Sequence, residues 1–130
     1  MLTASLSSYE CAWVTSPTAG QTITSFSAAA TSPGLFTLGV EYGYVGGVLG
    51  APEQTTSGGN FQLFLGNNQI GNQSDGFLNA PPVLNVMNTK YFLISLDGAT
   101  SIYLVANQAG TAAVKYAGAL WLTPVYLAQG

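Results

Sequence analysis

The segment KYFLISLDGATSIYLVA, residues 90–106, indicates most clearly which kind of fold this chain adopts. It contains two runs rich in aromatic and β-branched side chains, separated by the dipeptide Asp97-Gly98. Such runs are typical of β-strands, and Asp-Gly favours a turn because both residues tolerate positive φ angles. Neither run has the 3.6-residue period of an amphipathic helix, so we predict strands at Lys90–Leu96 and Ser101–Ala106.

Short apolar runs between clusters of Gly, Pro, Asn and Asp continue in both directions from this segment. We predict further strands at Tyr9–Val14, Gln21–Ser27, Leu35–Tyr44, Asn60–Leu65, Val83–Met87, Ala112–Tyr116 and Ala119–Leu127, with Gln69–Ile70 extending a hairpin. The expected fold is all-β: a two-sheet antiparallel jelly-roll sandwich of about eight strands. Residues 1–130 are expected to form one such domain, with residues 1–8 as an N-terminal arm.

The chain carries unusually little charge. Charged residues make up 5% of the sequence, against about 25% in an average soluble protein. The two basic residues, Lys90 and Lys115, are too few to neutralise a run of phosphates, so we expect no nucleic-acid partner. Histidine is absent and Cys11 is the single cysteine, so the sequence predicts no enzyme, no metal site and no cofactor.

The acidic residues and the cysteine give no catalytic pattern. The carboxylates are Glu10, Glu41, Glu53, Asp75 and Asp97, and no two of them fall in a recognisable glycosidase motif. Glu41 lies between Val40 and Tyr42 in a predicted strand, and we expect its side chain on a solvated face. Cys11 is expected to be a small buried side chain rather than a reactive thiol or an intersubunit bridge.

Three predicted strands are apolar on both faces. The last one presents Leu120 and Leu122 on one side and Trp121 and Val125 on the other, and residues 91–96 and 102–106 behave alike. Either a loop or the N-terminal arm covers the outer side, or another subunit does. The second interpretation is favoured, because a chain with so few charges should self-associate if it exposes an apolar face as a free monomer. The expected subunit interface contains Tyr91, Leu93, Tyr103, Val105, Trp121, Val125 and Leu127.

The order of parts from Asn60 to Leu127 resembles the trimeric jelly-roll domains related to tumour necrosis factor and the complement globular head. The hairpin FQLFLGNNQIG at residues 61–71 and the closing apolar strand carry the resemblance. Members of this group also form phage-fibre heads and capsid-decoration trimers, in which the closing strand lies near the three-fold axis. The resemblance therefore implies a homotrimer.

These observations together predict a virion structural protein of a bacteriophage. No apolar run reaches the ~20 residues of a membrane-spanning helix, and residues 1–5 lack the pattern of a signal peptide. We expect a capsid decoration (cement) or outer-capsid subunit, made in the host cytoplasm and placed on the virion surface. Its expected partners are its own copies and the major capsid protein or other virion proteins. The alternative is a receptor-binding or lectin-like tip domain that binds a glycan through Tyr42 and Tyr44.

Overall fold

The structure is a computed structural model that describes residues 4–5, 10–30, 34–50, 53, 61–66, 68–69, 77–78, 80, 83–96, 100–110 and 113–125. Within these residues the secondary structure is entirely β. The strands are β1 (Ala4–Ser5), β2 (Glu10–Thr15), β3 (Thr22–Ala30), β4 (Gly34–Val45), β5 (Phe61–Leu65), β6 (Asn68–Gln69), β7 (Phe77–Leu78), β8 (Val86–Leu96), β9 (Thr100–Ala106) and β10 (Lys115–Pro124).

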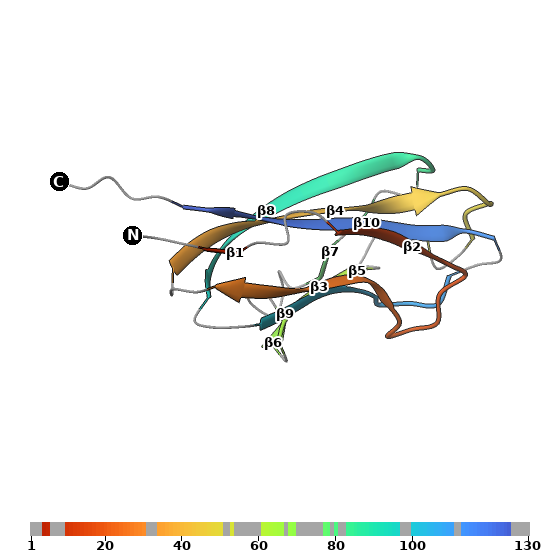
Figure 1. The fold of residues 1–130 in the computed structure, drawn as a ribbon. Helices are drawn as coiled ribbons and strands as arrows, with labels where there is room; N and C mark the ends of the chain where they lie inside the picture. The colour runs from red at the N-terminus through yellow and green to blue at the C-terminus, as the bar shows by residue number, and fades with distance from the viewer. Residues whose placement is uncertain are drawn as a thin grey trace.

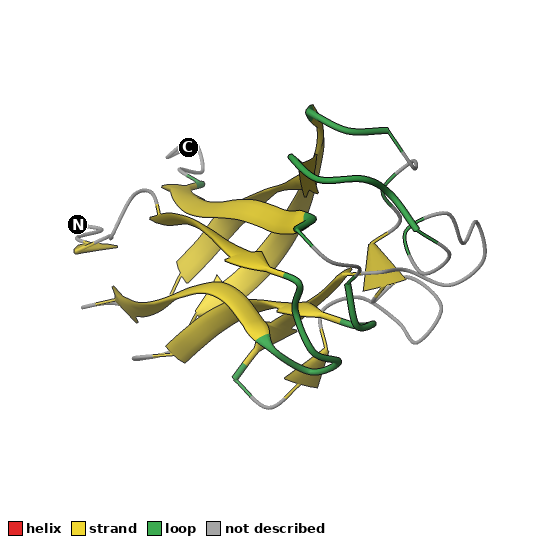
Figure 2. Ribbon diagram, turned by 90° about the vertical axis from the view of Figure 1, so that its right-hand side faces the viewer, coloured by secondary structure: helices red, strands yellow, loops and turns green. Residues whose placement is uncertain are grey.

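The strands form two antiparallel sheets that lie one above the other (Figures 1 and 2). The four-stranded sheet has the order β2-β10-β4-β8. The six-stranded sheet has the order β1-β3-β9-β5-β6, and its short strand β7 also pairs with β5. The predicted all-β, two-sheet antiparallel sandwich is therefore confirmed.

The strand order is that of a jelly roll. The chain folds back on itself in nested antiparallel pairs: β5 with β6 and β7, β4 with β8, β3 with β9, and β2 with β10. This long ribbon then rolls up, so that β10 also pairs with β4 and β9 also pairs with β5. Consecutive long strands consequently alternate between the two sheets, which is how a jelly roll closes around one core.

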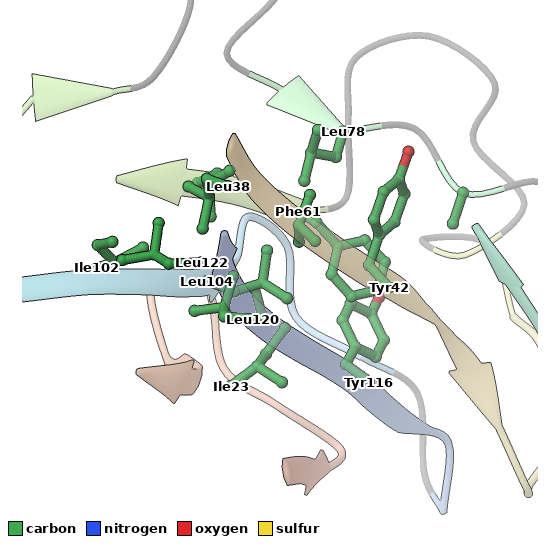
Figure 3. Packing of buried hydrophobic residues seen from close by; sticks show 14 of the residues in the cluster. Ile23, Leu38, Tyr42, Phe61, Leu78, Ile102, Leu104, Tyr116, Leu120 and Leu122 are labelled. Carbon is green, nitrogen blue, oxygen red and sulfur yellow. The ribbon is translucent and has the colours of Figure 1, made fainter. Parts of the chain in front are cut away.

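The core lies between the sheets and follows the two-residue period of the strands. In β4, the inward side chains are Phe36, Leu38, Val40, Tyr42 and Tyr44, all of them buried. Leucines 120 and 122 of β10 lie beside Ile23, Leu104 and Phe61 from the other sheet (Figure 3). Each large side chain removed from water here stabilises the fold by about 1.5–3 kcal/mol before chain entropy is counted.

Aromatic rings fill one end of the core. The rings of Tyr42, Tyr44, Phe61 and Tyr116 form neighbouring pairs with centroids 5.1–5.5 Å apart. All the pairs are tilted or edge-on, the geometry in which ring quadrupoles attract. This cluster joins β4 and β10 of one sheet to β5 of the other.

Two predicted breaks are continuous strand. Val83–Met87 and Lys90–Leu96 were predicted as separate strands, but β8 runs unbroken from Val86 because it pairs with β4 along its whole length. Ala112–Tyr116 and Ala119–Leu127 were likewise predicted as separate strands, yet β10 runs unbroken from Lys115 to Pro124 with Gly118 in its middle. A β-carbon on Gly118 would lie 2.3 Å from Leu104 Cδ2, so this glycine marks a close approach of the two sheets.

The structure describes two residues of the predicted N-terminal arm. Ala4 and Ser5 form β1 and pair with Ala30 and Ala29 at the edge of the six-stranded sheet. This pairing extends that sheet in its own plane, and it leaves the outer side of the four-stranded sheet uncovered by these residues.

Candidate subunit interface

The surface of interest is the side of the four-stranded sheet that points away from the core. We call this side the outer face. Its residues are Cys11, Trp13 and Thr15 of β2; Lys115, Ala117, Ala119, Trp121 and Thr123 of β10; Thr37, Gly39, Glu41 and Gly43 of β4; and Met87, Thr89, Tyr91, Leu93 and Ser95 of β8. These residues alternate along each strand with the inward positions, several of which are core side chains. The pairing of the strands sets them in rows across the sheet.

Large apolar side chains stand exposed along both edges of the outer face. Their exposed fractions are 60% for Trp13 on β2 and 37%, 63% and 66% for Met87, Tyr91 and Leu93 on β8. The residues between them in the row of Trp13 and Met87 are Ala117 and Gly43. In this row, small residues therefore lie in the middle and large apolar side chains lie on either side.

Trp121 packs onto the sheet itself. It lies beside Gly39 in the pairing of β10 with β4, and a β-carbon on Gly39 would lie 2.2 Å from Trp121 Cε2. The ring of Tyr91, next in the same row, meets the Trp121 indole edge-on with centroids 6.1 Å apart. Glycine at residue 39 thus provides the space that holds Trp121 half-buried and in contact with Tyr91.

Two charged side chains share this apolar surface. Glu41 lies in the middle of the outer face, in the row Cys11–Ala119–Glu41–Thr89, and its side chain is half-buried. The Lys115 ammonium group lies 5.4 Å from the centre of the Trp13 ring, a cation–π contact. The outward position of Glu41 matches the expectation from the sequence.

Three of the seven predicted interface residues lie together on the outer face: Tyr91, Leu93 and Trp121. Val125 follows β10 directly, is half-buried, and donates its backbone N–H to the carbonyl oxygen of Leu35 at 2.9 Å. Leu127 lies outside the described residues.

Tyr103 and Val105 lie on the opposite side of the molecule, so the seven residues do not form one surface. They belong to β9 of the six-stranded sheet and alternate along it with the core residues Ile102 and Leu104; Val105 is itself buried, with 6% exposure. Tyr103 stacks on Phe64 with ring centroids 5.2 Å apart, and both rings are half-buried. The sequence could not separate the two sets, because apolar runs in consecutive strands do not reveal which strands share a sheet.

The exposed tyrosine pair expected for glycan binding is not found. Tyr42 and Tyr44 are 2% and 0% exposed and contribute to the aromatic cluster of the core. The reason is the period of β4: its outward positions around them are Gly39, Glu41 and Gly43, so both tyrosines point inward. The exposed aromatic side chains of the four-stranded sheet are Trp13 and Tyr91 instead.

The expectation for Cys11 was wrong as well. Its side chain is exposed on β2, an edge strand of the four-stranded sheet, in the row of Ala119 and Glu41. Trp13, two residues along the same strand, is an exposed outer-face residue that the interface prediction missed, and Met87 on β8 is another. The sequence did contain a signal for this face, since Cys11, Trp13 and Thr15 alternate with Ala12 and Val14. Which of the two sets is buried depends on how the strand pairs, and the sequence does not show that.

A buried carboxylate, Glu53, lies between β4 and β5. Glu53 is fully buried; its Oε2 accepts a hydrogen bond from the Tyr116 hydroxyl and its Oε1 accepts one from the Gly50 N–H, both at 2.9 Å. Burial, with the hydrogen bond to Glu53 and its negative charge, raises the pKa of Tyr116 well above its ordinary value. The pair anchors the loop after β4 to β10. No sequence pattern predicted this pair, because Glu53 lies among turn residues.

Neither metal chemistry nor a membrane-spanning helix is indicated by the described residues. In that part of the chain, no three His, Cys, Asp or Glu side chains lie close enough together to hold a metal ion. No helix there is long and apolar enough to cross a membrane.

Comparison of the chain with protein-family models, curated proteins and solved structures found no match.

Proposed function

We propose that this protein is a structural subunit of a virion, a capsid decoration or outer-capsid protein that acts through protein–protein contacts and catalyses no reaction. The observation that carries the proposal is the exposed apolar outer face, with Trp13, Tyr91 and Leu93 each more than half exposed. Apolar patches of more than a few hundred Å² on soluble proteins commonly mark interaction sites.

The composition of the outer face suits a protein partner. Tryptophan, tyrosine and methionine are enriched at protein interfaces, and buried aromatic side chains dominate their binding energy. Trp13 and Met87 stand on either side of the small residues Ala117 and Gly43, and Tyr91 is exposed on the same strand as Met87, so an approaching surface meets large side chains beside small ones. The low charge of the whole chain, 5% of residues, supports assembly by area and shape rather than by ion pairs at the rim.

The resemblance of residues 60–127 to trimeric jelly-roll domains adds self-association, as a homotrimer, to the proposal. In such an assembly β10 lies close to neighbouring copies, and its outward residue Trp121 lies on the outer face. The major capsid protein or another virion protein is the second proposed partner, and the virion surface is the proposed location.

The alternative of a receptor-binding or lectin-like tip has lost its proposed residues, since Tyr42 and Tyr44 are buried. It would have to use Trp13 and Tyr91, the aromatic side chains that the outer face exposes. Binding on a glycan array that is lost in Trp13→Ala would favour this alternative over a shell subunit.

Purified protein tests the proposal by its mass in solution and its binding to capsids. We expect oligomers at micromolar concentration by light scattering, and loss of assembly in Leu93→Asp with the circular dichroism spectrum unchanged. Ser25→Asp is the control. It introduces the same carboxylate at an exposed position of the other sheet, and this variant should assemble normally. A monomer that also fails to bind any capsid lattice would contradict the proposal.

A further inference from the structure

The two charged side chains of the outer face have opposite signs and a fixed spacing. Lys115 is paired with Val45, and Glu41 is paired with Ala119, four residues further along β10. Four residues of strand and one step between strands correspond to about 14 Å between the two α-carbons. Ala117 and Gly43, which are paired with each other, lie halfway between them.

The two charges do not neutralise each other within one copy. Lys115 is directed over the Trp13 ring, and in the described part of the chain the Glu41 carboxylate has no ion-pair partner. In an exposed sheet this costs little, because water solvates both groups. Covering the outer face removes that water, and a buried carboxylate or ammonium group without a partner then opposes binding strongly.

A second copy of this chain supplies both missing partners. It brings a cation to place against Glu41 and an anion to place against Lys115, at the same spacing that the first copy presents. A neutral apolar partner would leave Glu41 desolvated and unpaired. We propose that the outer face binds the outer face of another copy, with Glu41 of one copy against Lys115 of the other. This inference rests on the self-association in the proposed function and specifies its first partner. Because each copy offers the same face and both charges, the contact is two-fold and joins two copies, in place of the three-fold contact that the resemblance implies.

The size and shape of the face agree with such a contact. Four neighbouring strands, taken at the ten-residue length of β10, give a flat area of about 600 Å² before side-chain relief, and a standard interface buries about 800 Å² per partner. The midpoint between the two charges is formed by Ala117 and Gly43, whose small side chains allow two faces to approach closely there. The flanking Trp13 and Met87 then contact the partner on either side of this midpoint.

Charge exchange tests the pairing. Dissociation constants are measured by light scattering and sedimentation for the wild type, Glu41→Lys, Lys115→Glu and the double variant that carries both changes. Each single change places like charges against each other and should weaken association by about tenfold or more. The double variant restores opposite charges and should associate within about threefold of the wild type.

Two controls keep the test sharp. Lys90→Glu makes the same charge change at an exposed position on the other side of β8, where Lys90 pairs with the inward residue Val40, and should leave association unchanged. Glu41→Gln removes the charge with almost no change in size, so it tests the pairing even where Glu41→Lys does not fold. It should weaken association less than Glu41→Lys does.

The possible outcomes separate this inference from the proposed function. The charge pairing is overturned if the wild type oligomerises and both single changes have no effect on association. It is also overturned if the double variant loses as much affinity as the two single variants combined. In both cases the outer face remains an interface. Wild type that stays monomeric also overturns the pairing. Binding of that monomer to a capsid lattice would then support the proposed function alone.

Discussion

The indole of Trp121 occupies the space where a side chain on Gly39 would stand. The two residues are paired between β10 and β4, and a β-carbon on Gly39 would lie 2.2 Å from Trp121 Cε2. The backbone of residue 39 is ordinary strand, so its glycine is required by this contact and not by an unusual φ angle. The contact sets the position of the largest aromatic group in the middle of the outer face.

Gly39→Ala should therefore displace Trp121. We expect a loss of about 1–3 kcal/mol in the free energy of unfolding, the usual cost of overpacking, and a shift in tryptophan fluorescence. Urea unfolding measures the first effect. In a Trp121→Ala background the same change should cost much less, and an equal cost in both backgrounds would show that the contact does not limit residue 39.

Tyr116→Phe should destabilise the fold through Glu53. The change removes the hydroxyl that donates to Glu53 Oε2 at 2.9 Å, so a buried carboxylate loses one of its donors. The expected loss is about 1–3 kcal/mol in urea unfolding. Tyr103→Phe is the matched control, because its half-buried ring stacks on Phe64 and needs no hydroxyl for that contact; an equal loss in both variants would contradict a role for the Glu53 hydrogen bond.

Stability should fall in alkaline solution. Burial raises the pKa of Tyr42 and of Tyr116 above the ordinary 10.0, so at high pH both tyrosines keep their protons in the folded state and lose them in the unfolded state. Their stabilisation is complete below about pH 10 and decreases as the pH rises further, by up to about 1.4 kcal/mol per pH unit for each tyrosine. Urea unfolding at increasing pH measures the slope. A flat profile above pH 10, or full titration of all seven tyrosines in the folded protein, would contradict this.

Cys11 should report on coverage of the outer face. Its thiol is exposed on β2 and shares a row with Ala119 and Glu41. We expect rapid reaction with a thiol reagent in dilute protein and a rate several-fold lower at concentrations where the protein is assembled. An assembled sample that reacts as fast as the dilute one would place Cys11 outside the contact.

The sequence was sufficient for the sheet architecture and insufficient for the faces. Alternation and turn residues predicted the all-β sandwich, whereas only Tyr91, Leu93 and Trp121 of the seven expected interface residues are found together on the outer face. The predicted break at Gly118 was wrong because a glycine in a turn and a glycine packed against a leucine of the other sheet look alike in a sequence. Tyr42 and Tyr44 were misplaced for a related reason: a strand pattern of period two does not state which of its two sides faces the core.

Oxidative footprinting with mass spectrometry, applied to dissociated and assembled protein, tests the central claim most directly. Trp13 and Tyr91 of the outer face should lose most of their reactivity on assembly, while Tyr103, on the opposite side of the sandwich, serves as an internal reference and should keep its own. Undiminished reactivity of Trp13 and Tyr91 in the assembled protein, or protection of Tyr103 alone, would contradict an assembly built on the outer face.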